Sequence, residues 1–285
     1  MPPRHPLDVL AQTWMMVGSR RMNAREAPWL IGPTAGSDVV GHGWVDSEAA
    51  RCGGTTSRGA DHGLLPSFRV LRGVTFDPGE VDERIVDFYE HTSRWSLDLW
   101  SEWSPLAWPF GRLITALFSH RLQQLSLPMR PLDVSFGMDS EVIHVHDSTG
   151  ALVGAAWQRT MRKTGDHTYS GLYGAVTLPG SEQPSVRVVF PLPIGNLPVF
   201  LRPSAGKAGD FHLRSPHGAF GEEGAYLVLH RKDGTINVRR IPIHEHFHLF
   251  VDDAGDLRCD HYVKLWDIPG VRLHYRMRRQ SPGGA

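Results

Sequence analysis

The chain has 285 residues, with 30 Lys and Arg against 30 Asp and Glu, so its formal net charge is zero. A chain of this length can bury a substantial hydrophobic core, and the balanced charge gives no electrostatic reason to expect nucleic acid or an anionic membrane as partner. The two cysteines, Cys52 and Cys259, are too few for a disulfide framework, so we expect both to be reduced in a cytoplasmic protein. No apolar run reaches the length of a transmembrane helix.

Residues 1–62 show little hydrophobic periodicity, and the stretch 47–62 has almost no large apolar side chain. A segment of this composition cannot bury enough apolar surface to offset the entropy lost on ordering it. We therefore predict a poorly ordered N-terminal extension over residues 1–62 and a single domain over residues 63–285. Because three further methionines follow within residues 15–22, a second hypothesis is that the natural chain starts later than its first residue.

Two helices are predicted near the start of this domain. Residues 77–80 (Asp-Pro-Gly-Glu) are typical of a helix start, with Asp as N-cap, Pro in the first turn and Glu at the third position, and the helix should end near His91. A second helix is predicted from about 110 to 125, where apolar side chains recur on one side. Between the two helices, residues 93–100 alternate apolar and polar side chains, which predicts a strand that carries Trp95.

From Val134 onwards, short apolar runs alternate with turn sequences rich in Gly, Asp and Pro. Turn signals at this spacing are typical of an antiparallel meander, sandwich or barrel. We predict a mainly β (α+β) fold, an antiparallel meander of about ten strands that closes into a barrel or a strongly curved sheet, with the two helices packed on it. The four prolines within residues 190–203 predict an edge, a bend or a pocket rim, because proline removes a hydrogen bond from a sheet.

Residues 243–266 read as one β-hairpin, in which two alternating strands flank an Asp- and Gly-rich turn. If Val251 lies opposite Leu257, the mostly apolar sides of both strands coincide, and a slip by one residue would separate them. This register sets Phe247 opposite His261. It also makes Glu245 a diagonal neighbour of His261 on the apolar side, within contact distance.

Glu245 and His261 are the candidate catalytic residues. A carboxylate and an imidazole buried together must pair, and such pairs are common in general acid–base catalysis. The alternative, which the sequence leaves open, is a structural ion pair without a chemical role.

The opposite side of the hairpin carries His244, His246 and His248, the candidate metal ligands, with Asp260 opposite His248. Imidazoles can bind Zn or Fe but need convergent partners, and a solvated strand face remains the alternative. His144 and His146 repeat the alternating pattern on another strand, so up to five imidazoles would converge if both strands faced the same interior.

Several short sequences together resemble a family of uncharacterised bacterial proteins: residues 88–92 (FYEHT), 103–104 (WS), 137–142 (GMDSEV), 190–193 (FPLP), 247–248 (FH) and 273–276 (LHYR). The resemblance covers about residues 64–278 and implies no activity. In the rhythm of its strands the chain is also similar to calycin-type barrels, a likeness of architecture that says little about function.

The leading functional hypothesis is a β-barrel that binds a small apolar molecule or a lipid. Glu245 and His261 would orient this ligand or move a proton on it, as in an isomerase, cyclase or lyase that needs no cofactor, and the predicted ligand contacts are Phe247, Trp157, Tyr173 and Trp95. The alternatives are a metal-dependent enzyme that uses the histidines and a non-catalytic carrier. The sequence leaves open whether the protein is an enzyme and what its oligomeric state is.

Overall fold

The structure is a computed structural model that describes residues 18–35, 43–104, 137–162, 165 and 170–280. Within these residues the fold is mainly β, with fourteen strands in one antiparallel sheet and two α-helices beside it. The helices are α2 (Trp44–Arg51) and α3 (Glu83–Glu90). The strands are β1 (Arg20–Asn23), β2 (Thr56–Arg58), β3 (Trp95–Trp103), β4 (Met138–His146), β5 (Leu152–Met161), β6 (Gly171–Thr177), β7 (Pro184–Leu192), β8 (Gly195–Ala205), β9 (Phe211–Arg214), β10 (Gly224–His230), β11 (Thr235–Ile241), β12 (Ile243–Val251), β13 (Leu257–Leu265) and β14 (Ile268–Arg279).

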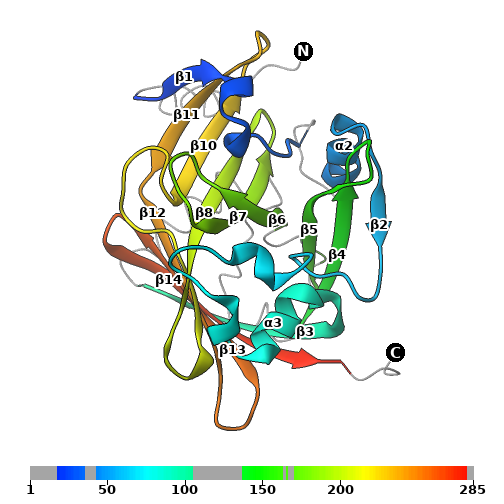
Figure 1. The fold of residues 1–285 in the computed structure, drawn as a ribbon, viewed down its shortest axis with the longest axis vertical. Helices are drawn as coiled ribbons and strands as arrows, with labels where there is room; N and C mark the ends of the chain where they lie inside the picture. Colours follow the sequence, from blue (N-terminus) through cyan, green and yellow to red (C-terminus); the bar gives the residue numbers. More distant parts are fainter. Residues whose placement is uncertain (1–17, 36–42, 105–136, 163–164, 166–169, 281–285) are drawn as a thin grey trace.

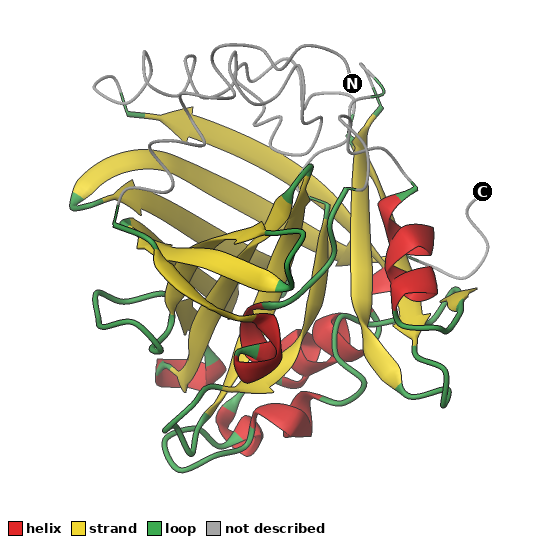
Figure 2. Ribbon diagram, turned by 90° about the horizontal axis from the view of Figure 1, so that it is seen from above, coloured by secondary structure: helices red, strands yellow, loops and turns green. Residues whose placement is uncertain are grey.

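The strands pair in the order β2-β4-β5-β6-β7-β8-β9-β12-β13-β14-β3, and the resulting sheet is strongly curved (Figures 1 and 2). The sheet is not closed, so the predicted barrel is wrong, although the antiparallel meander is confirmed. Closure would need backbone hydrogen bonds between β3 and β4. Part of the required edge of β4 is instead paired with β2, where Ser57 lies opposite His144.

Strand β8 is the branch point of the sheet. One of its edges pairs with β7, and the other edge pairs first with β10, up to Phe200, and then with β9 from Arg202 onwards. The prolines Pro198 and Pro203 lie within this strand and cannot donate backbone hydrogen bonds. Because β8 has neighbours on both sides, it is not an edge strand despite these prolines. Strand β10 connects it to the outer pair β11 and β1.

Helix α3 covers one end of the concave side of the sheet (Figure 1). Its apolar face consists of Ile85, Phe88 and Tyr89, which join the main hydrophobic core. The predicted helix matches α3 only in its second part. Residues 78–80 form a separate 3-10 turn, and the α-helix is capped by Asp82, whose side chain accepts a hydrogen bond from the backbone N–H of Arg84. The predicted helix at 110–125 lies outside the described residues.

The described parts of residues 1–62 are packed against the sheet, in contrast to the predicted poorly ordered extension. Strand β1 pairs with β11, and Trp44 and Val45 of α2 are buried against Ile143 of β4. Residues 47–62 do lack large apolar side chains, as the sequence indicates. Apart from Ala49, the N-terminal residues in this cluster lie before that stretch; they are Ala35, Trp44 and Val45.

Candidate functional site

The pairing of β12 with β13 is the one that the hydrophobic pattern predicts. Val251 lies opposite Leu257, and Phe247 lies opposite His261. Glu245 and His261 therefore point to the same side of the sheet, into a cavity, whereas His248 lies on the other side.

Glu245 and His261 form a direct ion pair inside the protein. Nε2 of His261 lies 2.8 Å from Oε2 of Glu245, and the two side chains are only 6% and 15% exposed. The ring of Phe247 stacks on His261, with the centroids 3.7 Å apart and the planes inclined by 14°. A carboxylate can only accept, so Nε2 of His261 is the donor of this hydrogen bond. Nδ1 has no hydrogen-bond partner in the part of the chain that the structure describes.

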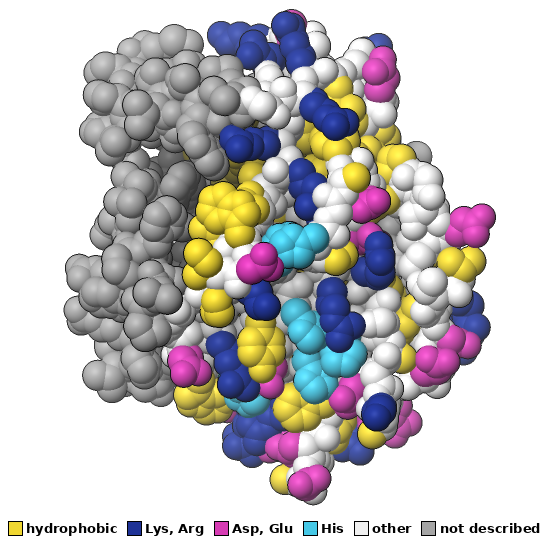
Figure 3. Space-filling model, turned by 90° about the vertical axis from the view of Figure 1, so that its left-hand side faces the viewer, with side chains coloured by type: hydrophobic (Ala, Val, Ile, Leu, Met, Phe, Trp, Pro, Cys, Tyr) yellow, Lys and Arg dark blue, Asp and Glu magenta, His cyan; other side chains and the backbone are white. Residues whose placement is uncertain are grey.

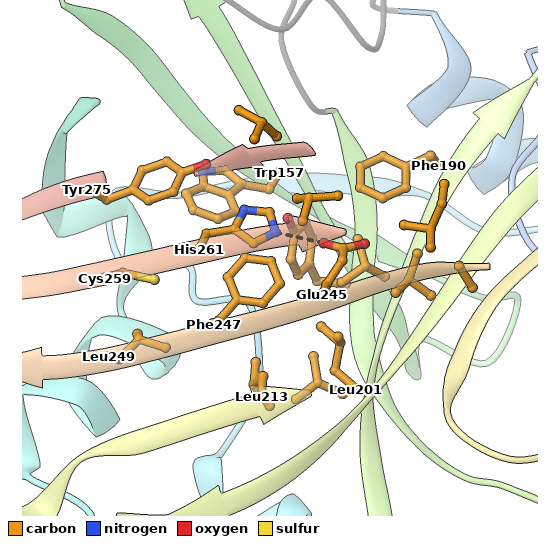
Figure 4. Close-up of a pocket in the computed structure, with 18 of the residues that line it drawn as sticks. Trp157, Phe190, Leu201, Leu213, Glu245, Phe247, Leu249, Cys259, His261 and Tyr275 are labelled. Carbon is orange, nitrogen blue, oxygen red and sulfur yellow. Dashed lines mark hydrogen bonds and ion pairs between the residues drawn. The ribbon is translucent and has the colours of Figure 1, made fainter. Parts of the chain in front are cut away.

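The pair lines a cavity of about 420 Å³ between the curved sheet and α3 (Figure 4). Apolar side chains make up most of its wall, among them Phe88 and Tyr89 of α3 and Val188 of β7. Phe247, Trp157 and Tyr173, all named as ligand contacts from the sequence, lie in this wall. A cavity of this size and character is typical of a site for a small molecule.

Arg159 and Tyr275 are among the polar residues of the wall that the sequence analysis missed. Arg159 lies over the ring of Trp157 at 4.2 Å and hydrogen-bonds to Tyr173. Burial raises the pKa of Tyr173 and that of Tyr275, so both hydroxyls stay protonated and can donate hydrogen bonds. Alternation along β5 was the available signal for Arg159, since it lies two residues after Trp157 and so faces the same side.

Trp95 is the exception among the predicted ligand contacts, because it does not line the cavity. Its indole N–H donates a hydrogen bond to Asp87, and its ring packs edge-on against Phe88. Trp95 therefore links α3 to β3, and its predicted role as a ligand contact is corrected.

The three histidines on the outer side of β12 have three different partners. Nδ1 of His244 lies 3.1 Å from the carbonyl oxygen of Ser215. His246 and His248 turn instead toward residues around β9. A metal site made of these three histidines alone is therefore not formed.

His144 and His146 lie on β4, away from the β12 histidines in the strand order. His144 stacks on His62 and contacts the carbonyl oxygen of Gly63, while His146 contacts Ser57. The predicted convergence of five imidazoles is wrong, because the histidines of β4 contact residues 57–63 whereas those of β12 contact residues 210–215.

Asp260 lies opposite His248 in the predicted register, but its carboxylate bonds elsewhere. Oδ1 of Asp260 is 2.8 Å from Nδ1 of His274 on β14. The partner of His248 is Asp210, whose Oδ2 lies 2.8 Å from Nε2 of His248. Strand pairing thus predicted which residues are opposite, but not which side chains bond.

Partial burial makes the folded protein sensitive to mild acid. Desolvation is the main cause that lowers the pKa of five histidines below 6.5, to about 4 for two of them, His212 and His246; the other three are His144, His230 and His244. Below pH 6.5 the unfolded chain therefore binds more protons than the folded chain. The contribution of these histidines to the free energy of unfolding is complete above pH 6.5 and is lost as the pH falls toward 4. We expect the melting temperature, measured by circular dichroism in the presence of a chelator, to be lower at pH 5 than at pH 7.5 by at least roughly 4 °C. An unchanged melting temperature across this range would contradict the expected burial.

Comparisons with known protein families, with curated proteins and with solved structures found no match to this chain. The resemblance to a family of uncharacterised bacterial proteins therefore stays a prediction, and the functional argument depends on the geometry of the site. Among the described residues, no helix has the length and apolar character needed to cross a bilayer.

Proposed function

We propose that this protein binds a small apolar molecule in the cavity and moves a proton on it with Glu245 and His261, without a cofactor. The observation that carries the proposal is a buried carboxylate–imidazole pair in the wall of an otherwise almost wholly apolar cavity of about 420 Å³. A purely structural role would be served as well by two apolar side chains, because burying an ion pair costs desolvation energy.

The distribution of polar groups supports a ligand that is mostly hydrocarbon and carries one polar oxygen. Most of the wall is aliphatic or aromatic. The hydroxyls of Tyr173 and Tyr275 are protonated and can donate, and Arg159 hydrogen-bonds to the hydroxyl of Tyr173. Such donors suit a carbonyl or hydroxyl oxygen of the ligand.

The chemistry that fits these groups is isomerisation through an enolate. The Glu245–His261 pair removes a proton from a carbon beside a ligand carbonyl, and the electron pair of the broken C–H bond moves to the carbonyl oxygen. A tyrosine hydroxyl stabilises that oxygen by a hydrogen bond. The proton then returns to a different carbon, so no oxidant or reductant is consumed.

The test begins with the ligand itself. Mass spectrometry of an organic extract of the purified protein identifies a molecule that copurifies with it. That molecule is then incubated with the protein in D2O and followed by NMR, and we expect deuterium to enter at carbon positions next to a carbonyl. A ligand that binds but gains no deuterium would identify a carrier, and the absence of any apolar ligand would overturn the proposal.

Filling the cavity is expected to abolish ligand binding. Val188 is buried in the cavity wall, so Val188→Trp places an indole in the space that the ligand needs. We expect the dissociation constant, measured by fluorescence titration with the extracted ligand, to rise at least about tenfold, equivalent to about 1.4 kcal/mol. The matched control is Val74→Trp, since Val74 is 69% exposed and outside the cavity wall, and it should bind normally. Unchanged binding by Val188→Trp would exclude this cavity as the site.

A further inference from the structure

Three potential metal ligands meet on the side of the sheet opposite the cavity. Asp210 immediately precedes β9, His212 lies on β9, and His248 lies directly opposite His212 on β12. One potential ligand atom from each residue lies within 4.8 Å of the other two. Figure 3 shows histidine side chains gathered on this face of the molecule.

The two imidazoles lie against each other, and the aspartate contacts one of them. His212 and His248 stack with their centroids 4.5 Å apart, and Oδ2 of Asp210 is 2.8 Å from Nε2 of His248. Nδ1 of His212 lies 3.1 Å from Nε2 of His246, which leaves Nε2 of His212 for another partner. A hydrogen bond of this kind to the remote nitrogen is what orients most metal-binding histidines.

The backbone of the β8–β9 turn comes close to two of these side chains. A Cβ placed on Gly206 would lie 2.7 Å from Nε2 of His212 and 2.9 Å from Cβ of Asp210. Only glycine therefore allows the β8–β9 turn to approach the two side chains this closely. Nε2 of His212 thus lies on the side of Asp210, as binding to a shared ion requires.

We propose that Asp210, His212 and His248 bind a zinc ion, with His246 as the residue that orients His212. Two imidazoles and one carboxylate are a typical zinc ligand set, and solvent would complete the tetrahedron at this half-buried surface. Zinc–ligand bonds of about 2.0–2.2 Å place neighbouring ligand atoms roughly 3.3 Å apart, so the Asp210–His248 contact needs to widen only slightly.

The site goes beyond the proposed function, because it lies on the other side of β12 from Glu245. Zinc bound there would join the β8–β9 turn to β12 and would take no part in chemistry in the cavity. Its expected effect is on stability, since a ligand that binds only the folded state raises the melting temperature.

The experiment uses untagged protein that has been treated with a chelator and dialysed. Isothermal titration with zinc chloride should give one site, and a hundredfold excess of zinc over its dissociation constant should raise the melting temperature by several degrees. His248→Gln, His212→Gln and Asp210→Asn should each abolish the shift. His246→Phe should weaken binding about 10- to 100-fold, because it removes only an orienting contact.

The matched control is His274→Gln. His274 also pairs with an aspartate at 2.8 Å, but no third metal ligand joins that pair among the described residues. This variant should bind zinc as the wild type does. Asp210→Asn keeps the size of the side chain, so it separates loss of a ligand from loss of the fold, which circular dichroism also checks. Absence of stoichiometric zinc binding, or binding that the three ligand variants leave unchanged, would overturn the proposal.

Discussion

Replacing Glu245 with glutamine is expected to lower deuterium exchange into the bound ligand at least about 100-fold while the protein stays folded. Glutamine has nearly the same shape and can still accept a hydrogen bond from Nε2 of His261, but it cannot support a positive charge on the ring. The rate is measured by NMR in D2O with the extracted ligand, and ligand affinity is measured in parallel. Affinity should change far less than rate, because the apolar wall of the cavity is intact.

The control for this variant is Asp260→Asn, which alters a similar carboxylate–imidazole contact on the outer side of the same hairpin. It should leave the exchange rate unchanged. A second variant, His261→Asn, tests the other member of the pair and should lose exchange to a similar degree. If Glu245→Gln exchanges deuterium at the wild-type rate, the pair has only a structural role.

Replacing Trp44 with alanine is expected to destabilise the whole protein by about 3–5 kcal/mol. Trp44 is 2% exposed and packs with Val45 of α2 and with Ile143 of β4, so its removal leaves a cavity between the N-terminal segment and the sheet. The free energy of unfolding is measured by urea denaturation.

The matched control is Trp100→Ala, because Trp100 is 48% exposed on β3. Its loss should cost no more than about 1 kcal/mol. Equal effects of the two substitutions would mean that residues around Trp44 do not contribute to the fold, as the composition of residues 1–62 predicts.

The central hairpin shows how much of the structure the local alternation of side chains can predict. The register of β12 and β13 was predictable because a slip by one residue would separate the two apolar sides, and the observed pairing brings Glu245 to His261. Trp157 and Tyr173, also predicted as ligand contacts, lie in the cavity wall. Arg159 was missed although it faces the same side, because a lone arginine in a strand is usually read as exposed.

The open sheet and the packed N-terminal segment were not predictable in this way. Composition over residues 47–62 suggested disorder, but β2 within that stretch pairs with β4 and occupies part of the edge that closure would need. A strand of three residues has almost no periodicity of its own, so its position depends on the edge that the rest of the fold presents.

The outer histidines show most clearly what the local sequence pattern cannot predict. Alternation along β12 was sufficient to place His246 and His248 on one side and Glu245 on the other, because neighbouring side chains in a strand point in opposite directions. Their bonding partners came from β9 and its preceding turn, and Asp210 is 38 positions away from His248. No local pattern records such a contact, since it depends on which distant strand the folded sheet places alongside.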